Sequence, residues 1–381
     1  MERHGEVMKM EQYVTSYLKN YQNAKNDWNY EDGCVLMGVI LLYQITGETD
    51  YKEFIIRYMR KFIDEDGSIN YYSKEHYNID CINTGKILFF LYEETKEEKY
   101  RMAIEVLMDQ LRSQPRTECG SFWHKMIYPN QIWLDGLYMA LPFYMEYETK
   151  FNGKKNYKDI INQFKNARRY LYNEEKKLYY HGYDEARIQY WADKQTGLSG
   201  NFWLRAMGWY MMALIDTMEK MSEEIFEAYK TLEMLFKECV KGILLYQDRD
   251  SKLFYQIIDR ADLSNNYLET SGSAMVACSI LKGCRLGVLN KEKYQRIGEE
   301  ILLSLLDNKL VEAEGRLRLI DICGVAGLGP GETRDGSLSY YLSEPIVCDD
   351  QKGAGALFMA YSQGAMLKRE EKYPKQKWRN G

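Results

Sequence analysis

The sequence lacks the features of proteins that bind nucleic acids. No stretch is rich in Lys and Arg, and the formal net charge is −5. Because binding to a phosphate backbone depends on clustered basic side chains, we exclude a nucleic acid as a partner. A small anionic substrate is compatible with this charge, since a few cations in a pocket outweigh the global sign.

Signals for membranes and zinc are also missing. No run approaches the roughly 18 apolar residues that a membrane span needs, and residues 1–6 contain no apolar signal-peptide core. The eight Cys include no Cys-x-x-Cys pair, and no His stands at zinc-like spacing. From these absences we expect a soluble, reduced, cytoplasmic protein that makes no contact with a membrane and holds no zinc.

Two common catalytic loops are absent as well. The segment Gly324–Gly331 is rich in Gly, but it lacks the Lys-Ser/Thr ending of a phosphate-binding loop. It is more typical of a long loop near the mouth of a cavity. There is no Gly-x-Ser-x-Gly elbow and no Ser/His/Asp set that spacing alone identifies.

What the sequence does contain is a repeated pair of helical patterns. Only six Pro interrupt long stretches of i, i+3, i+4 apolar spacing. Helices with one charged face begin near residues 9, 50, 99, 156, 223 and 293, and each precedes a charge-poor helix that begins near residue 32, 80, 135, 201, 269 or 350. A helix that is apolar nearly all round is buried, so six such hairpins predict an all-α (α/α)6 barrel in one domain, residues 1–381. An open α-solenoid is the alternative, but it would need polar capping repeats that we do not find.

Polar residues gather where the charge-poor helices start: Asp80, Asp135, Arg205, Glu269–Ser271 and Asp349–Asp350. Each acidic or hydroxyl side chain is open to two interpretations. It caps the helix by accepting free backbone N–H groups, or it faces a cleft at one end of the ring.

The densest group of reactive side chains lies between Phe122 and Tyr138. It includes His124, Lys125, Trp133 and Asp135. Desolvation by Trp133 would raise the pKa of Asp135 and keep a proton available, whereas the helix N-terminus would lower that pKa. The sequence alone leaves the net direction open.

Two more aromatic segments follow. One contains His181, and in the other Trp203 and Trp209 flank Arg205, which stands four residues before Trp209 and shares its helix face. An Arg between two indoles suits a carboxylate carried on a sugar ring. The same three side chains are also compatible with a structural cation–π cluster in the core.

At these segments the sequence resembles the unsaturated rhamnogalacturonyl hydrolases, glycoside hydrolase family 105, which are relatives of the unsaturated glucuronyl hydrolases of family 88. The similar motifs are Tyr-Pro-x-Gln-x-Trp-x-Asp-Gly-Leu-Tyr-Met at 128–139, His-Gly-Tyr-Asp at 181–184, Phe-Trp-x-Arg-x-x-Gly-Trp-Tyr at 202–210, and the runs at 267–275 and 350–355. Together these motifs extend over nearly the whole chain, in order.

The resemblance implies an (α/α)6 barrel and a substrate whose non-reducing end is a 4,5-unsaturated uronic acid. It implies hydration of the C4=C5 bond, with no metal or organic cofactor. Asp135 would protonate C4 and take a proton from the water that adds at C5, Asp80 would orient water or sugar hydroxyls, and His181 would be the pocket histidine. The resemblance further implies substrate-binding roles for Tyr30, His124, Lys125, Trp133, Trp203, Arg205 and Trp209.

Other functions are compatible with the same residues. One is an unsaturated glucuronyl hydrolase that acts on glycosaminoglycan fragments, and another is a conventional glycosidase with two carboxylates. A third is a non-catalytic sugar-binding toroid, which would need the aromatic side chains and the Arg but not Asp135.

Overall fold

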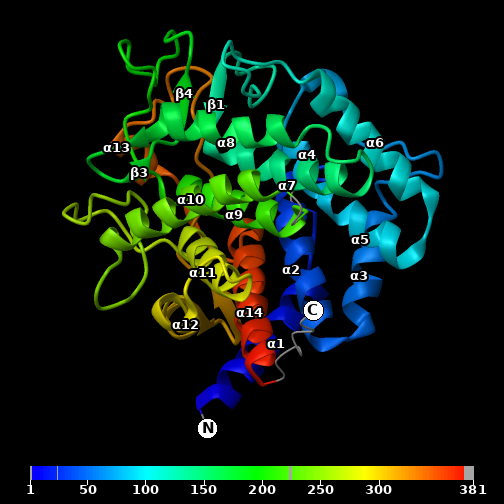
Figure 1. Cartoon of the computed structure of the whole chain (residues 1–381). Coiled ribbons are helices and arrows are strands. Elements are labelled where there is room, and N and C mark those ends of the chain that lie inside the picture. Colours follow the sequence, from blue (N-terminus) through cyan, green and yellow to red (C-terminus); the bar gives the residue numbers. More distant parts are fainter. Residues whose placement is uncertain (1, 24, 223–224, 373–381) are drawn as a thin grey trace, which may run out of the picture.

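The computed structural model describes residues 2–23, 25–222 and 225–372, and in this part of the chain two layers of helices form a ring (Figure 1). The outer layer consists of α1 (Glu2–Lys19), α3 (Thr49–Met59), α6 (Glu98–Ser113), α8 (Tyr157–Leu171), α10 (Phe226–Ile243) and α12 (Lys291–Asn308). The inner layer consists of α2 (Tyr30–Thr46), α4 (Asp80–Thr84), α5 (Lys86–Thr95), α7 (Leu134–Lys150), α9 (Leu204–Lys220), α11 (Thr270–Arg285) and α14 (Gln351–Lys372).

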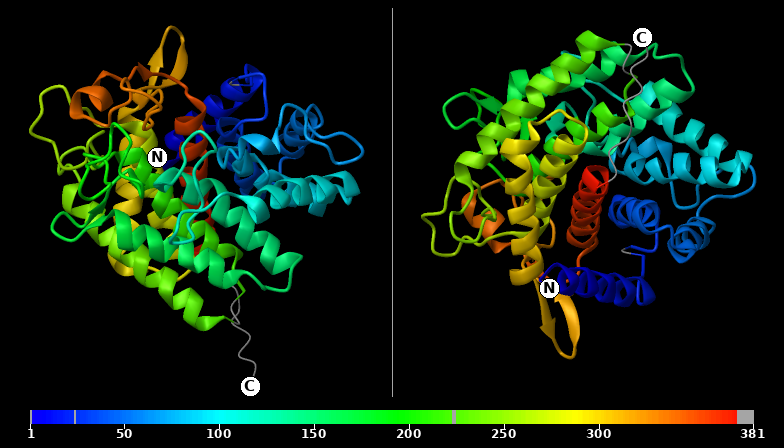
Figure 2. Two further views of the ribbon diagram at one scale, coloured as in Figure 1. Left: turned by 90° about the horizontal axis from the view of Figure 1, so that it is seen from above. Right: turned by 60° about the horizontal axis from the view of Figure 1, so that its bottom comes forward.

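The inner helices close on themselves. In chain order α2, α4, α7, α9, α11 and α14 each pack against the next, and α5 packs against α2 and α4. Helix α14 also packs against α2, so the last hairpin meets the first. Figure 2 shows α14 beside α2 although the two helices lie at opposite ends of the chain. This closure confirms the predicted (α/α)6 barrel and excludes the open solenoid.

The two layers follow from the two sequence patterns. In α11 every residue from Thr270 to Cys284 is buried, as expected of a helix with neighbours on all sides. In α8 the buried residues include Ile160, Phe164 and Leu171, which lie on one face of an otherwise charged helix. Burial of this apolar surface in both layers is the main favourable contribution to the fold.

Two predicted helix starts differ from the described structure. The first outer helix begins at Glu2, before the predicted start near Lys9, because residues such as Gly5, Val7 and Met8 are exposed and this segment carries no apolar period that the sequence could reveal. The predicted start near Glu223 lies outside the described residues, and α10 begins at Phe226.

All inner helices begin at the same end of the ring, and the long connections gather there. They include four antiparallel two-stranded ladders: β1 (Gln131–Trp133) with β4 (Gly182–Asp184), β2 (Tyr172–Asn173) with β3 (Leu178–Tyr179), β5 (Leu310–Ala313) with β6 (Arg316–Leu319), and β7 (Ile322–Cys323) with β8 (Ile346–Val347). Three short helices lie in the same connections: η1 (Lys74–His76), η2 (Leu244–Tyr246) and α13 (Leu338–Ser343). This end therefore carries most of the polar residues that the sequence singles out. Within the described ranges no helix is both long enough and apolar enough to cross a lipid bilayer.

Candidate active site

A short ladder positions the central carboxylate and histidine. Strand β1 pairs antiparallel with β4, with Trp133 opposite Gly182. Next to this last pair the backbone N–H of Leu134 donates to the carbonyl of His181 at 3.1 Å. Asp135 follows β1 in the first turn of α7, and His181 precedes β4. The ladder therefore brings together two residues that are far apart in the sequence.

The side chains of these two residues face each other. Asp135 Oδ2 lies 3.1 Å from His181 Nε2, with the imidazole fully buried and the Asp135 side chain 13% exposed. The pair is not aligned as a hydrogen bond, and neither atom has a hydrogen-bond partner elsewhere in the described residues. Buried polar atoms are nearly always paired, so two unpaired atoms that face each other indicate a functional site.

His181 is held from its other side. Its Nδ1 lies 2.7 Å from the hydroxyl of Tyr341 in α13, and both groups are buried. The ring of Trp203 lies 4.8 Å from the imidazole, and the edge of Trp133 meets it at 5.5 Å. These contacts fix the direction in which Nε2 points.

A second carboxylate lies in a basic setting at the start of α4. Asp80 Oδ2 is 2.6 Å from Lys125 Nζ, and Asp80 Oδ1 is 3.3 Å from His124 Nε2. Burial lowers the pKa of His124 to about 4, so this imidazole is neutral at pH 7. Burial alone would raise the pKa of Asp80, but the net shift is downward, and we attribute this to the Lys125 cation. Asp80 is therefore ionised.

Stacked rings connect the two carboxylates. Trp133 stacks on His124 at 4.5 Å and on Tyr128 at 4.7 Å. The stack leaves little space at Gly136, where an added Cβ would lie 3.0 Å from His124 Nδ1. Glycine after Asp135 therefore lets His124 approach the first turn of α7.

The capping interpretation applies to only some of the acidic side chains at the helix starts. Glu269 accepts from the N–H groups of Ser271 and Gly272, and Asp350 accepts from the N–H of Lys352. Asp80 and Asp135 cap no helix, because each lies inside its helix and its oxygens face basic or imidazole groups. This difference separates structural from candidate catalytic carboxylates.

Arg205 and its two indoles do not form the sandwich that their spacing suggests. Arg205 is 1% exposed and lies 4.9 Å from the ring of Trp203, whereas Trp209 stacks on Tyr138 at 4.8 Å. The guanidinium donates through Nη1 to Ser271 Oγ at 3.1 Å and to the Cys323 carbonyl at 2.5 Å. These contacts favour the structural interpretation of the cluster.

Tyr30 lies on the same end of the ring, in the first turn of α2, and is half-buried. Burial raises the pKa of its hydroxyl well above the ordinary value, with Asp80 raising it further and Arg205 lowering it. Its hydroxyl thus stands within the electrostatic influence of both the Asp80 and the Arg205 groups.

Sequence reasoning missed Tyr341 and underused the loop that starts at Gly324. Leu328 is fully buried and packs with Tyr128, Trp133 and Trp191, and Gly182 has no room for a Cβ because Leu328 Cδ1 would lie 2.6 Å from it. The loop thus lies against the ladder, in agreement with its predicted place near the site. Nothing in the local sequence around Tyr341 marks a partner 160 residues away.

In the part of the chain that the structure describes, no group of three or more His, Cys, Asp or Glu side chains is arranged to hold a metal ion.

Comparison with known proteins finds relatives among the glycoside hydrolases. The sequence model of glycosyl hydrolase family 88 matches residues 5–368. The chain is similar to a solved family 105 glycoside hydrolase from C. acetobutylicum ATCC 824, at 42% identity and a TM-score of 0.90, over 94% of this chain and 99% of that one. The unsaturated glucuronyl hydrolase of Bacillus sp. GL1 shares the fold, at 18% identity and a TM-score of 0.63, over 92% and 88% of the two chains. The unsaturated rhamnogalacturonyl hydrolase YesR of Bacillus subtilis (strain 168) is 25% identical over 299 residues, 76% of this chain and 78% of YesR.

Proposed function

Because the chain belongs to glycosyl hydrolase family 88, we propose that it removes a 4,5-unsaturated uronic acid from the non-reducing end of pectin-derived rhamnogalacturonan oligosaccharides. The observation that carries this proposal is the pair of unpaired buried atoms, Asp135 Oδ2 and His181 Nε2. The rhamnose linkage is supported by the similarity to YesR, which is named for that activity.

The proposed reaction adds water across the C4=C5 bond. Asp135 gives its proton to C4, and positive charge develops at C5 and on the adjacent ring oxygen. The resulting carboxylate then takes a proton from the water whose oxygen bonds to C5, which restores the acid. The product is a hemiketal that opens, and the next sugar leaves as an alcohol.

His181 and Asp80 have separate roles in this proposal. His181, oriented by Tyr341, lies 3.1 Å from Asp135 Oδ2, and we assign Oδ1 to the side that faces the sugar. Asp80 is ionised and held by Lys125, so it does not supply the proton, and we assign it to orienting water or sugar hydroxyls.

The lining side chains are assigned by their exposure. Tyr30 and Lys125 keep accessible surface at this end of the ring and are proposed to contact the substrate, with His124 and Trp133 behind them. Trp203, Arg205 and Trp209 are each 1% exposed, so we propose that they support the site through packing and through the Cys323 carbonyl.

The Asp135→Asn variant tests catalysis. We expect turnover to fall by a factor of about 10² to 10⁴, because the acid and base are removed together, while ligand binding is retained. Asp350→Asn is the matched control, since Asn also caps a helix and its turnover should stay close to that of the wild type. Unchanged turnover in Asp135→Asn would support the binding-toroid alternative and end the proposal.

The substrate is tested separately. Loss of the ultraviolet absorbance of the enol ether reports hydration, and it is followed with unsaturated galacturonyl-rhamnose and with an unsaturated chondroitin disaccharide. We expect the rhamnose-linked compound to be hydrated faster. Faster hydration of the chondroitin compound would favour the glycosaminoglycan alternative, and no loss with either would overturn the proposed reaction.

We also propose a cytoplasmic location. All eight cysteines are free thiols, and six of them have a pKa raised by burial, to about 12 for Cys34. Unpaired thiols are typical of reducing compartments. Fractionation of cells into cytosolic and secreted proteins tests this location.

A further inference from the structure

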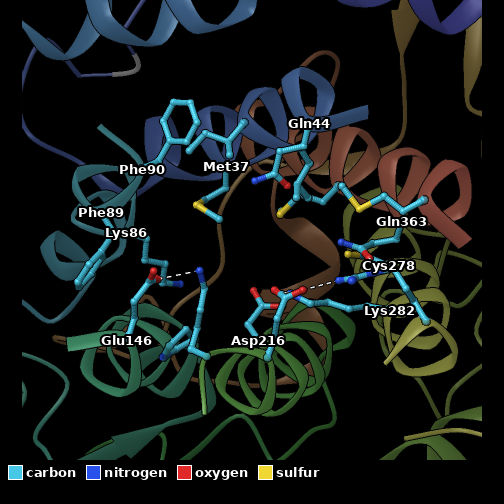
Figure 3. Close-up of a pocket in the computed structure, with 18 of the residues that line it drawn as sticks. Met37, Gln44, Lys86, Phe89, Phe90, Glu146, Asp216, Cys278, Lys282 and Gln363 are labelled. Atoms are coloured by element: carbon cyan, nitrogen blue, oxygen red, sulfur yellow. Dashed lines mark hydrogen bonds and ion pairs between the residues drawn. The ribbon is translucent and has the colours of Figure 1, made fainter. Parts of the chain in front are cut away.

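A cavity of about 220 Å³ lies at the end of the ring opposite to Asp135. It is bounded by the later turns of the inner helices α2, α5, α7, α9, α11 and α14, whose side chains converge on one space (Figure 3). A cavity lined by six of the inner helices is a feature of the ring itself, and the proposed reaction does not use it.

The cavity has one charged wall and one largely apolar wall. Charged side chains come from α7, α9 and α11, whereas α2 and α14 contribute mostly apolar ones, among them Met37 and Met359. Helix α5 contributes both kinds, Phe89 and Phe90 beside Lys86 and Glu93. Apolar surface next to fixed polar groups suits a small molecule that has both kinds of surface.

The charged wall is held rigid by ion pairs. Glu146 pairs with Lys220 at 2.8 Å, and Asp216 Oδ1 pairs with Lys282 Nζ at 2.8 Å. Glu219 bridges Lys282 and Arg285. Because these side chains are paired with one another, their polar atoms keep their positions on the cavity wall when a ligand binds.

Two polar groups on this surface have hydrogen-bonding capacity left for a ligand. Gln363 is fully buried, its Oε1 accepts from Arg285 Nε at 2.8 Å, and its Nε2 has no hydrogen-bond partner. The amide points into the shared space in Figure 3. Asp216 contacts Lys282 through Oδ1, and a carboxylate with two oxygens can accept further hydrogen bonds. An unpaired donor and a carboxylate acceptor thus line one cavity.

The cavity is separate from the site at Asp135. The Nζ of Lys86 lies 3.5 Å from the ring centre of Tyr138, and Tyr138 stacks on Trp209 at 4.8 Å. These buried side chains form a plug, Lys86–Tyr138–Trp209, across the middle of the ring. Along α9, Trp209 lies between Arg205 and Asp216, which are about 16 Å apart on a helix.

We propose that this cavity binds a neutral monosaccharide. A sugar hydroxyl accepts from Gln363 Nε2, another donates to Asp216 Oδ2, and the C–H face of the ring packs on the apolar wall. Hydroxyl groups suit both the amide donor and the carboxylate acceptor, because each hydroxyl is donor and acceptor. The volume is below the roughly 300–1,000 Å³ of pockets for drug-sized ligands, which favours one sugar ring.

The charge of the lining favours a neutral ligand over a sugar acid. Four acidic side chains (Glu93, Glu146, Asp216 and Glu219) face four basic ones (Lys86, Lys220, Lys282 and Arg285). Burial lowers the pKa of Lys86 to about 7, so even this cation is only partly charged near neutrality. The wall therefore offers no excess positive charge to a carboxylate.

Methionine methyl groups supply a direct test. Met37, Met359 and Met366 line the cavity. In protein labelled with ¹³C at the methionine methyl groups, titration with L-rhamnose is expected to shift these three signals with a saturable curve. A sugar bound at the Asp135 end leaves them in place. The proposal fails when no cavity signal shifts with L-rhamnose, or when only D-galacturonate shifts them.

Two matched variants locate the contact. Gln363→Glu keeps the acceptor for Arg285 and replaces only the free donor, so we expect about fivefold weaker binding of L-rhamnose. Gln44→Glu makes the same change at an exposed position of the same cavity and should weaken binding less than twofold. Equal weakening in both variants would overturn the assignment of Gln363. Hydration of the unsaturated substrate is expected to stay unchanged in Gln363→Glu, which keeps this test independent of the proposed function.

Discussion

Asp135 and His181 lie at the two sides of one ladder, and the pairing of Trp133 with Gly182 sets the distance between them. The carboxylate follows the strand β1 and the imidazole precedes β4, so the backbone brings the two side chains within reach. The contacts of His181 with Tyr341 and Trp203 then set the direction of Nε2, which lies 3.1 Å from Oδ2. Two side chains on a rigid scaffold keep their geometry without help from the substrate.

The Tyr341→Phe substitution removes the hydroxyl that faces His181 Nδ1 and keeps the ring. We expect kcat to fall about tenfold with little change in KM, because one hydrogen bond that orients the imidazole is lost. Tyr340→Phe is the control, because that hydroxyl contacts Gly327 instead. An unchanged kcat in Tyr341→Phe would contradict an orienting role.

The Gly136→Ala substitution tests the close approach of His124 to α7. The added Cβ would lie 3.0 Å from Nδ1 of the imidazole and 3.4 Å from Ile79 Cγ2. We expect a loss of about 1–3 kcal/mol in the free energy of unfolding, together with reduced turnover. Gly5→Ala is the matched control, because nothing lies within 4 Å of a Cβ at that helical position, and alanine should not destabilise it. Equal stability of the two variants would show that His124 and the rings stacked on it can move away from the added Cβ at little cost in free energy.

Acid sensitivity should come partly from His124. Its pKa is about 4 in the folded protein and near 6.5 in the unfolded chain, so between these values the unfolded chain binds more protons. Stability from this group is complete above pH 6.5 and is lost as the pH falls toward 4. Asp80, whose pKa is lowered, adds a separate loss below its ordinary value of 3.8.

The His124→Gln variant isolates the first of these windows. Urea titrations at pH 7 and pH 5 measure the free energy of unfolding, and we expect the wild type to lose about 2 kcal/mol more than the variant between these pH values. An equal loss in both proteins would mean that another group causes the sensitivity.

The Arg205→Lys substitution distinguishes the two interpretations of the aromatic cluster. A lysine cannot reach both Ser271 Oγ and the Cys323 carbonyl in the same way, so we expect a loss of about 1–3 kcal/mol in stability. Thermal unfolding and steady-state kinetics are measured on the same sample. A raised KM with an unchanged melting temperature would instead mean that Arg205 contacts the substrate.

The sequence predicted the ring because its signal is periodic. The charged face of α8 and the scarcity of charges in α11 show directly in the residue pattern. Six such hairpins are most simply arranged as a closed ring. The start of α1 at Glu2 was not predicted, because the segment before Lys9 carries no apolar period of about 3.6 residues.

The candidate site was predictable only in part, for a physical reason. Asp80, His124, Asp135 and His181 stand out by residue type, and their family motifs place them together. Tyr341 stands out in neither way, because its role depends on a contact across 160 residues. Trp209 was predicted to flank Arg205 from helix spacing, but Tyr138 on the neighbouring helix offers it a better partner. Spacing along one helix does not reveal what the next helix presents.

The plug of Lys86, Tyr138 and Trp209 has a consequence for how a polymer is approached. A sugar bound at the Asp135 end cannot pass through the ring at the level of these three buried side chains. Under the proposed function, the substrate would therefore enter and the products would leave through the same opening.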